Sequence, residues 1–253
     1  MNKKEIIDKI MEKKEFSQLP LRDVEIAFKQ FERRETTEED KIKLTRDLLR
    51  RVFSVFTTTK FSSLRRKSAE EILKKHASTR ERFEHYNEVY ERIFSGMGKR
   101  ISIIDLGSGV NGMSYDYFKK IGLKVDYVGV EAMGQLVELM NDYFKKNKID
   151  GKAIHASLFQ FDEVKKIVEK TEKPRVILLL KTIDSLEMLE RDYSKKIISE
   201  LIGKCDKFVI SFATRSMISR RKFKVKRYWI LTFLEENYNI LDDFEIGGEK
   251  YIV

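Results

Sequence analysis

Short apolar segments alternate with segments of helical periodicity from Lys99 to the last residue of the sequence. This alternation predicts an α/β fold with a mainly parallel sheet covered on both faces, because each parallel strand needs a crossover connection. The expected strands are ISIID (101–105), VDYVGV (125–130), KAIHA (152–156), RVILLL (175–180), KFVISF (207–212), ILDDFEI (240–246) and KYIV (250–253). The expected helices between them cover 113–121, 133–147, 160–170, 186–203 and 228–237.

The last two expected strands break the alternation. They are joined through Gly247 and Gly248, a turn signal typical of a hairpin, so the final strand should lie antiparallel at or near the sheet edge. Dinucleotide dehydrogenases normally continue with parallel strands. Seven strands ending in a hairpin instead indicate the Rossmann-like, class I fold of S-adenosylmethionine-dependent methyltransferases.

The first 95 residues have a different texture. They contain no glycine, and their apolar residues recur at helical spacing, which predicts four or five helices. Breaks are expected near Pro20, near Thr36 and Thr37, and at TTTKFSS (57–63). The sequence therefore predicts a helical N-terminal domain over 1–95 and an α/β domain over 96–253.

A glycine-rich loop follows the first expected strand in IIDLGSGVNG (103–112). Glycine at Gly107 and Gly109 lets the backbone approach a ligand closely. Glu131 ends the next strand and can accept hydrogen bonds from both hydroxyls of a ribose, a need that NAD and S-adenosylmethionine share. The loop pattern alone does not distinguish NAD, S-adenosylmethionine or an empty loop.

Asp105 favours one of these ligands. The DxGxG pattern that begins with Asp105 resembles the first motif of class I methyltransferases, in which the acid helps to orient the methionine end of the cofactor. In addition, the expected elements include no second substrate domain, which disfavours a dehydrogenase. We therefore expect S-adenosyl-L-methionine as the cofactor.

The charge of the chain indicates a polyanionic partner. The formal net charge is +10, and the run RSMISRRKFKVKRY (215–228) carries seven Lys or Arg and no acid, with aromatic residues among them. Such a run can neutralise phosphates and stack on bases, so RNA is the expected partner. The candidate RNA-binding residues are Arg215, Arg220, Arg221 and Lys222.

Other classes of protein are disfavoured. No apolar run is long enough for a membrane span, and MNKKEIIDKIMEKKEF (1–16) lacks the apolar centre of a signal peptide. A single cysteine, Cys205, and three histidines without metal-ligand spacing disfavour a metal centre. We expect a cytoplasmic protein with neither a membrane nor a metal partner.

The methyl acceptor stays open on the residues alone. The place after the fourth strand reads LLLKTIDSLE (178–187), without the Asn or Asp followed by Pro-Pro-Tyr that often accompanies exocyclic amine methylation. A ribose 2'-hydroxyl must lose a proton, and Lys181 would be the centre of such a base without identifiable partners. Guanine N7 already carries a free lone pair, so a site without an obvious base permits N7 methylation and does not establish it.

Five blocks of the sequence resemble the aminoglycoside-resistance guanine-N7 methyltransferases of small-subunit (16S) ribosomal RNA. They are HASTRERFEHYNEVYERIF (76–94), IIDLGSGVNG (103–112), ILLLKTIDSLE (177–187), VISFATRSMISRRK (209–222) and FEIGGEKYIV (244–253). The resemblance implies methyl transfer to a guanine of the decoding site, with a helical N-terminal domain that helps to bind the ribosomal small subunit. It also leaves room for a housekeeping relative that acts on another ribosomal or transfer RNA site.

The resemblance also implies roles for particular residues. Arg80 would meet the cofactor carboxylate, Ser157 and Leu158 would flank the adenine, and Lys181 is the catalytic candidate, facing the cofactor pocket or the target base. Arg215, Arg220 and Arg221 lie where RNA contact is implied. The alternatives are the same fold acting on another RNA position, including a ribose 2'-hydroxyl, and a non-catalytic RNA-binding or assembly factor.

Overall fold

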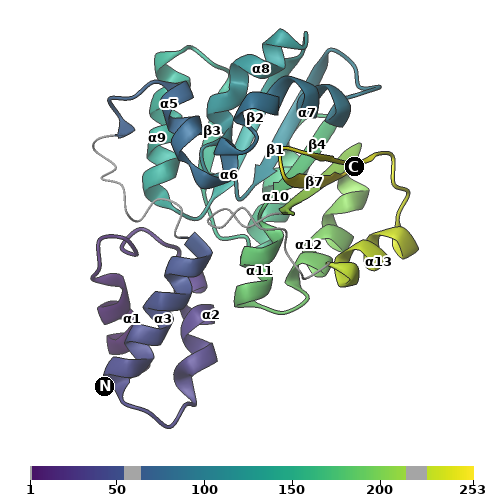
Figure 1. The fold of residues 1–253 in the computed structure, drawn as a ribbon. Helices are drawn as coiled ribbons and strands as arrows, with labels where there is room; N and C mark the ends of the chain where they lie inside the picture. The colour runs from purple at the N-terminus through teal and green to yellow at the C-terminus, as the bar shows by residue number, and fades with distance from the viewer. Residues whose placement is uncertain (1, 54–63, 215–226) are drawn as a thin grey trace.

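The computed structural model describes residues 2–53, 64–214 and 227–253. Its centre is a seven-stranded sheet with the order β3-β2-β1-β4-β5-β7-β6 (Figure 1). The strands are β1 (Arg100–Leu106), β2 (Lys124–Glu131), β3 (Gly151–His155), β4 (Arg175–Leu180), β5 (Lys207–Ala213), β6 (Asp243–Ile246) and β7 (Glu249–Ile252). Each predicted strand is present, which confirms the predicted α/β sheet.

The last two strands form the predicted hairpin. β1 to β5 pair in parallel, whereas β7 pairs antiparallel with both β5 and β6. Gly247 and Gly248 make the turn with φ values of 63° and 84°, a region that favours glycine. β6 starts at Asp243, three residues later than the prediction from 240.

Helices cover both faces of the sheet. The helices of the α/β part are α8 (Tyr115–Lys120), α9 (Gly134–Lys146), α10 (Phe161–Lys170), α11 (Ile183–Leu189), α12 (Tyr193–Leu201) and α13 (Tyr228–Asn237). Neighbouring residues of the central strand β4 belong to different cores: Leu178 is part of the core that includes residues of α8 and α9, and Leu179 is part of the core that includes residues of α10 to α13. This two-sided burial explains why β4 is a continuous apolar run.

One predicted helix, over 186–203, is wrong. Two helices, α11 and α12, occupy this stretch, and Asp192 between them has φ of 60°. Glu187 near the end of α11 accepts hydrogen bonds from the backbone N–H groups of Asp192 (2.6 Å) and Ser194 (3.0 Å). Its carboxylate therefore satisfies the free N–H groups at the start of α12. No glycine or proline marks this break in the sequence, so helical periodicity did not predict it.

The N-terminal part is helical, as predicted, with more helices than expected. Its described helices are α1 (Lys3–Met11), α2 (Leu21–Glu32), α3 (Glu38–Phe53), α5 (Ala69–Lys75), α6 (Ala77–Arg80), a 3-10 turn η1 (Phe83–His85) and α7 (Tyr86–Ile93). The breaks near Pro20 and near Thr36 and Thr37 are confirmed, and the expected break at 57–63 lies outside the described residues. The division of the chain at residue 95 stays a prediction.

Helices α1 to α3 form a lobe of their own, and α5 to α7 lie over the sheet (Figure 1). The lobe contacts α11 through residues of α2 and α3. The Gln30 amide donates hydrogen bonds to the carbonyls of Met188 (2.8 Å) and Leu189 (3.0 Å), and the Ser185 hydroxyl donates to the Val52 carbonyl (3.3 Å). These bonds hold the lobe beside the carboxyl ends of the strands.

Within the described ranges, no helix combines the length and the apolar character that crossing a bilayer requires.

Candidate active site

A cavity lies at the carboxyl ends of β1, β2 and β4, where ligands of open α/β sheets bind. The cavity is open to solvent on one side, and its wall combines apolar side chains with a few polar groups, as small-molecule sites do. Its lining residues are Asp23, Val52, Phe53, His76, Ser78, Gly107, Gly109, Glu131, Ala132, Met133, Leu136, Leu158, Phe159, Leu180, Lys181, Thr182, Ser185, Leu186 and Leu189.

The glycine loop forms one wall of the cavity. Gly107 and Gly109 have φ values of 72° and 52°, so other side chains would strain the backbone there. A Cβ atom at Gly107 would lie 2.7 Å from the Thr182 hydroxyl, and one at Gly109 would lie 3.3 Å from the His76 ring. The loop therefore passes so close to its neighbours that a side chain larger than that of glycine does not fit without movement of these neighbours.

Glu131 ends β2, is buried and lines the cavity. One carboxylate oxygen accepts a hydrogen bond from the Gly109 N–H (2.8 Å) and the other accepts one from the Met133 N–H (2.8 Å). Burial raises the pKa of Glu131, and these backbone hydrogen bonds oppose the rise. The carboxylate is thus fixed in place, and its oxygens retain lone pairs that can accept from a ligand.

Asp105 lies beneath the loop and does not line the cavity. It accepts hydrogen bonds from the Tyr127 hydroxyl (2.6 Å) and the Asn111 amide (2.8 Å). Burial raises the pKa of Asp105, and the bonds from Tyr127 and Asn111 oppose the rise. Through its bond with Asn111, Asp105 fixes the end of the glycine loop.

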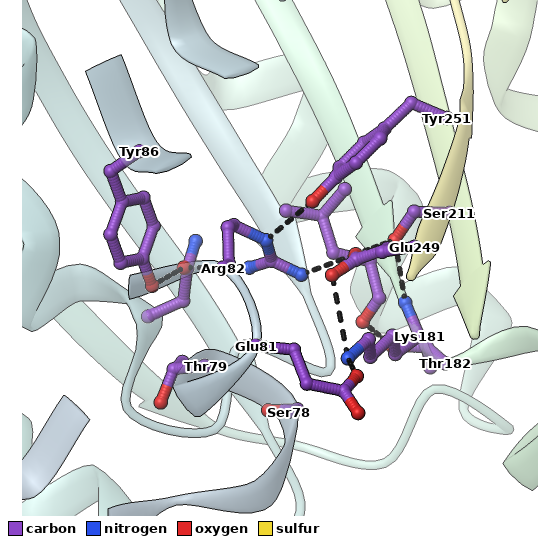
Figure 2. A network of polar contacts seen from close by, with 12 residues as sticks. Ser78, Thr79, Glu81, Arg82, Tyr86, Lys181, Thr182, Ser211, Glu249 and Tyr251 are labelled. Atoms are coloured by element: carbon purple, nitrogen blue, oxygen red, sulfur yellow. Dashed lines mark hydrogen bonds and ion pairs between the residues drawn. The ribbon is translucent and has the colours of Figure 1, made fainter. Parts of the chain in front are cut away.

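Lys181 follows β4 and lines the cavity. Its ammonium group is paired with Glu81 and lies 3.4 Å from Glu249 (Figure 2). Lys181 has φ of 54°, and its N–H donates to the Ser211 carbonyl (3.0 Å). A non-glycine residue held at positive φ carries strain that is typical of functional sites.

Comparison with known families agrees with this geometry. The family model described as ribosomal RNA methyltransferase (FmrO) matches residues 40–236, more than half of the chain. The chain belongs to this ribosomal RNA methyltransferase family.

The relatives of this chain include a named enzyme and several solved structures. The 16S rRNA (guanine(1405)-N(7))-methyltransferase of Proteus mirabilis is 26% identical over 187 residues, which cover 72% of this chain and 63% of the relative. The 16S rRNA methyltransferase RmtF in complex with S-adenosyl-L-homocysteine superimposes with a TM-score of 0.80 at 21% identity, covering 100% and 98% of the two chains. An rRNA methylase from Escherichia coli gives a TM-score of 0.76 at 18% identity, covering 99% and 98%. The predicted class I methyltransferase fold is confirmed.

The structure brings together most of the cofactor-binding residues that the sequence predicts for this family member. Gly107, Gly109, Glu131 and Leu158 line the cavity, and so does Lys181, the predicted catalytic residue. Ser157, the chain neighbour of Leu158, is fully buried and does not line the cavity.

Three sets of predicted residues lie elsewhere. Asp105 is buried, bonded to Asn111 and Tyr127, and does not line the cavity, so its role in orienting the methionine end of the cofactor stays a prediction. Arg80 is exposed at the end of α6 and is not part of the cavity lining, so its contact with a cofactor carboxylate stays a prediction. Arg215, Arg220, Arg221 and Lys222 lie outside the described residues.

A buried polar network that reaches Lys181 through Glu249 was missed from the sequence (Figure 2). At its centre, Arg82 donates hydrogen bonds to Glu249 (2.6 Å), the Asn111 side chain (3.0 Å) and the Tyr251 hydroxyl (3.1 Å). Both charged side chains of the Arg82–Glu249 pair are only 1% exposed. The network ties the segment before β1 and the last strand to the glycine loop.

The other missed residue is Asp23, which reaches the cavity from α2 of the N-terminal lobe. Asp23 is 2% exposed, and its Oδ2 atom has no hydrogen-bond partner among the described residues. Burial raises the pKa of this carboxyl group to about 6, and a hydrogen bond with Ser157 opposes the rise. Glu131 adds to the rise, and His155 counteracts it.

The raised pKa of Asp23 predicts a pH-dependent cost to stability. The unfolded carboxyl ionises near its ordinary pKa of 3.8 and the folded one near 6, so ionisation of Asp23 destabilises the fold as pH rises through this window. Asp23→Asn should therefore be more stable than the wild type at pH 7.5, by about 3 kcal/mol, and lose this advantage at pH 4. Thermal melts at both pH values measure the difference.

Asp162→Asn is the matched control, because Asp162 also occupies the first turn of a helix and is exposed. An advantage of Asp23→Asn that is the same at pH 4 and pH 7.5 would contradict the prediction.

Proposed function

We propose that this chain is an S-adenosylmethionine-dependent methyltransferase that modifies guanine N7 in the 16S RNA of the ribosomal small subunit. The observation that carries the proposal is the match of residues 40–236 to a ribosomal RNA methyltransferase family, with a small-molecule cavity beside the glycine loop. The named activity of the Proteus mirabilis relative supports the choice of 16S RNA and of guanine N7.

The residues around the cavity suit this cofactor. Gly107 and Gly109 leave a cradle that a side chain would fill, and Glu131 presents fixed carboxylate oxygens for the ribose hydroxyls. Leu158 and Met133 provide apolar surface suited to the adenine. When bound, the cofactor supplies a methyl group on a positively charged sulfur.

Methylation of guanine N7 requires no general base from the chain. Guanine N7 attacks with a free lone pair, so no proton must be removed before methyl transfer, and the main tasks are alignment and exclusion of water. Lys181 is proposed to act in this alignment, since Glu81 and Glu249 hold its side chain at the cavity wall. The basic run over 215–228 and the N-terminal lobe are proposed to bind RNA in the cytoplasm.

Methyl transfer to defined RNA substrates tests the proposal. Purified protein is incubated with tritiated S-adenosylmethionine and either isolated small subunits or naked 16S RNA, followed by nucleoside mass spectrometry. We expect 7-methylguanosine in at least one of the two substrates. A methyl group on a ribose or on another base atom would replace the N7 assignment, and cofactor binding without transfer to either RNA would support a non-catalytic RNA-binding factor.

A further inference from the structure

The most unusual group in the cavity is the carboxylate of Asp23. It comes from α2 of the N-terminal lobe, whereas the glycine loop and Glu131 come from the α/β part. It lines the cavity while only 2% exposed, and its Oδ2 atom lacks a hydrogen-bond partner among the described residues. A buried carboxylate oxygen without a partner is costly, so a partner in the functional state is expected.

The surroundings of Asp23 contain groups that favour its ionised form. The Ser157 side chain lies close enough to Asp23 to lower the pKa of its carboxyl group. The Ser157 oxygen itself accepts from the Phe159 N–H (3.0 Å), which leaves the hydroxyl hydrogen free to be donated to Asp23. Asp23 also sits in the first turn of the 12-residue helix α2, where the helix dipole favours a negative charge.

The missing partner of Asp23 should be a hydrogen-bond donor. An ionised carboxylate only accepts hydrogen bonds, and the neighbouring Glu131 is a second acid that raises the pKa of Asp23 rather than pairing with it. His155, whose charge would favour the ionised form of Asp23, has its Nε2 atom 2.9 Å from the Ala132 carbonyl. Apolar side chains of Leu158, Phe159 and Met133 make up the adjacent wall.

We propose that Asp23 is a specificity-determining residue that accepts a hydrogen bond from the exocyclic amine of the cofactor's adenine. This inference rests on the proposed function, because it assumes an adenosine cofactor in the cavity. Adenine combines a flat apolar surface with one amine that carries two N–H donors, and Asp23 and the apolar wall match these two features. The three-helix lobe thereby takes part in cofactor recognition.

A comparison of two ligands tests the assignment. S-adenosylhomocysteine is compared with S-inosylhomocysteine, in which an oxygen replaces the exocyclic amine, and dissociation constants are measured by calorimetry on the full chain at pH 7.5. The wild type should prefer the adenosine ligand by about 10-fold or more. S-inosylhomocysteine lacks the charge-assisted hydrogen bond from the amine, and the oxygen that replaces the amine places a second acceptor against the Asp23 carboxylate. In Asp23→Ala the preference should fall to about 3-fold or less.

A matched control and a folding check accompany this measurement. Asp162→Ala removes an exposed first-turn aspartate from α10 and should keep the wild-type preference. Thermal melts report whether Asp23→Ala is folded. If that variant does not fold, Asp23→Ser keeps a small polar side chain without the charge and is expected to show the same loss of preference.

The outcomes separate the inference from the proposed function. Wild-type binding of S-adenosylhomocysteine with a preference that Asp23→Ala retains would overturn the role of Asp23 and leave the cofactor assignment intact. Equal weakening of both ligands in Asp23→Ala would also overturn it, since the carboxylate would then contact a part that the two ligands share. If the wild type binds neither ligand, the cofactor assignment and the inference both fall.

Discussion

Replacing Glu131 with alanine is expected to weaken the binding of S-adenosylmethionine by about 100-fold or more. The reason is that each hydrogen bond from a ribose hydroxyl to a buried carboxylate contributes about 1.5–3 kcal/mol, and we propose that Glu131 accepts two. The same change removes the acceptor for the Gly109 and Met133 N–H groups, so the glycine loop also loses its support. Calorimetric titration with the cofactor measures the loss.

The control for this variant is Glu138→Ala. Glu138 is exposed on α9 and pairs with Arg65 on the surface, so its removal should leave cofactor affinity within a few-fold of the wild type. An affinity of Glu131→Ala close to that of Glu138→Ala would remove Glu131 from the cofactor site.

A loss of stability of about 3–5 kcal/mol is expected for Glu249→Gln. The change leaves the buried guanidinium of Arg82 without its counter-charge and deprives Lys181 of one of its two acids. Although burial would raise the pKa of Glu249, the charges of Arg82 and Lys181 lower it below its ordinary value. The stabilisation is therefore present above the unfolded pKa and is lost as pH falls toward the folded one. Urea denaturation at pH 7.5 measures the difference.

Two further variants identify buried charge as the cause. Asp242→Asn breaks the Arg92–Asp242 pair, another arginine–carboxylate pair, whose side chains are 42% and 29% exposed, and it should cost less than about 1 kcal/mol. The double variant Arg82→Met with Glu249→Gln removes both charges of the buried pair and should recover part of the lost stability. A double variant no more stable than Glu249→Gln alone would mean that lost packing, rather than an uncompensated charge, causes the effect.

The strands and the glycine loop could be predicted because local sequence determines them. The run RVILLL is buried on both faces, so its apolar character and its boundaries coincide with β4. The Gly247–Gly248 turn likewise follows from backbone freedom at two positions. Gly107, Gly109 and Glu131 were predictable because they lie at fixed places relative to two such strands.

The missed features depend on contacts between distant segments. Asp23 looks like an ordinary first-turn acid of α2, and only the packing of the lobe brings it to Ser157 and the cavity. Arg82 pairs with Glu249, 167 residues later in the chain, and local sequence does not show that Arg82 is buried while Arg80 is exposed. The break before α12 is a side-chain cap supplied by Glu187, which does not follow from helical periodicity.

The cavity wall has a mechanical consequence, because it takes Asp23, Val52 and Phe53 from the three-helix lobe and the remaining residues from the rest of the chain. A ligand that contacts both sets acts as a non-covalent cross-link between the two parts. Thermodynamic linkage then makes the effect mutual. If a surface binds the lobe in this arrangement, it raises the affinity for the ligand by the same factor by which the ligand raises the affinity for that surface. A force that separates the lobe from α11 would raise the dissociation rate of the ligand. The residence time of the ligand would therefore report the position of the lobe.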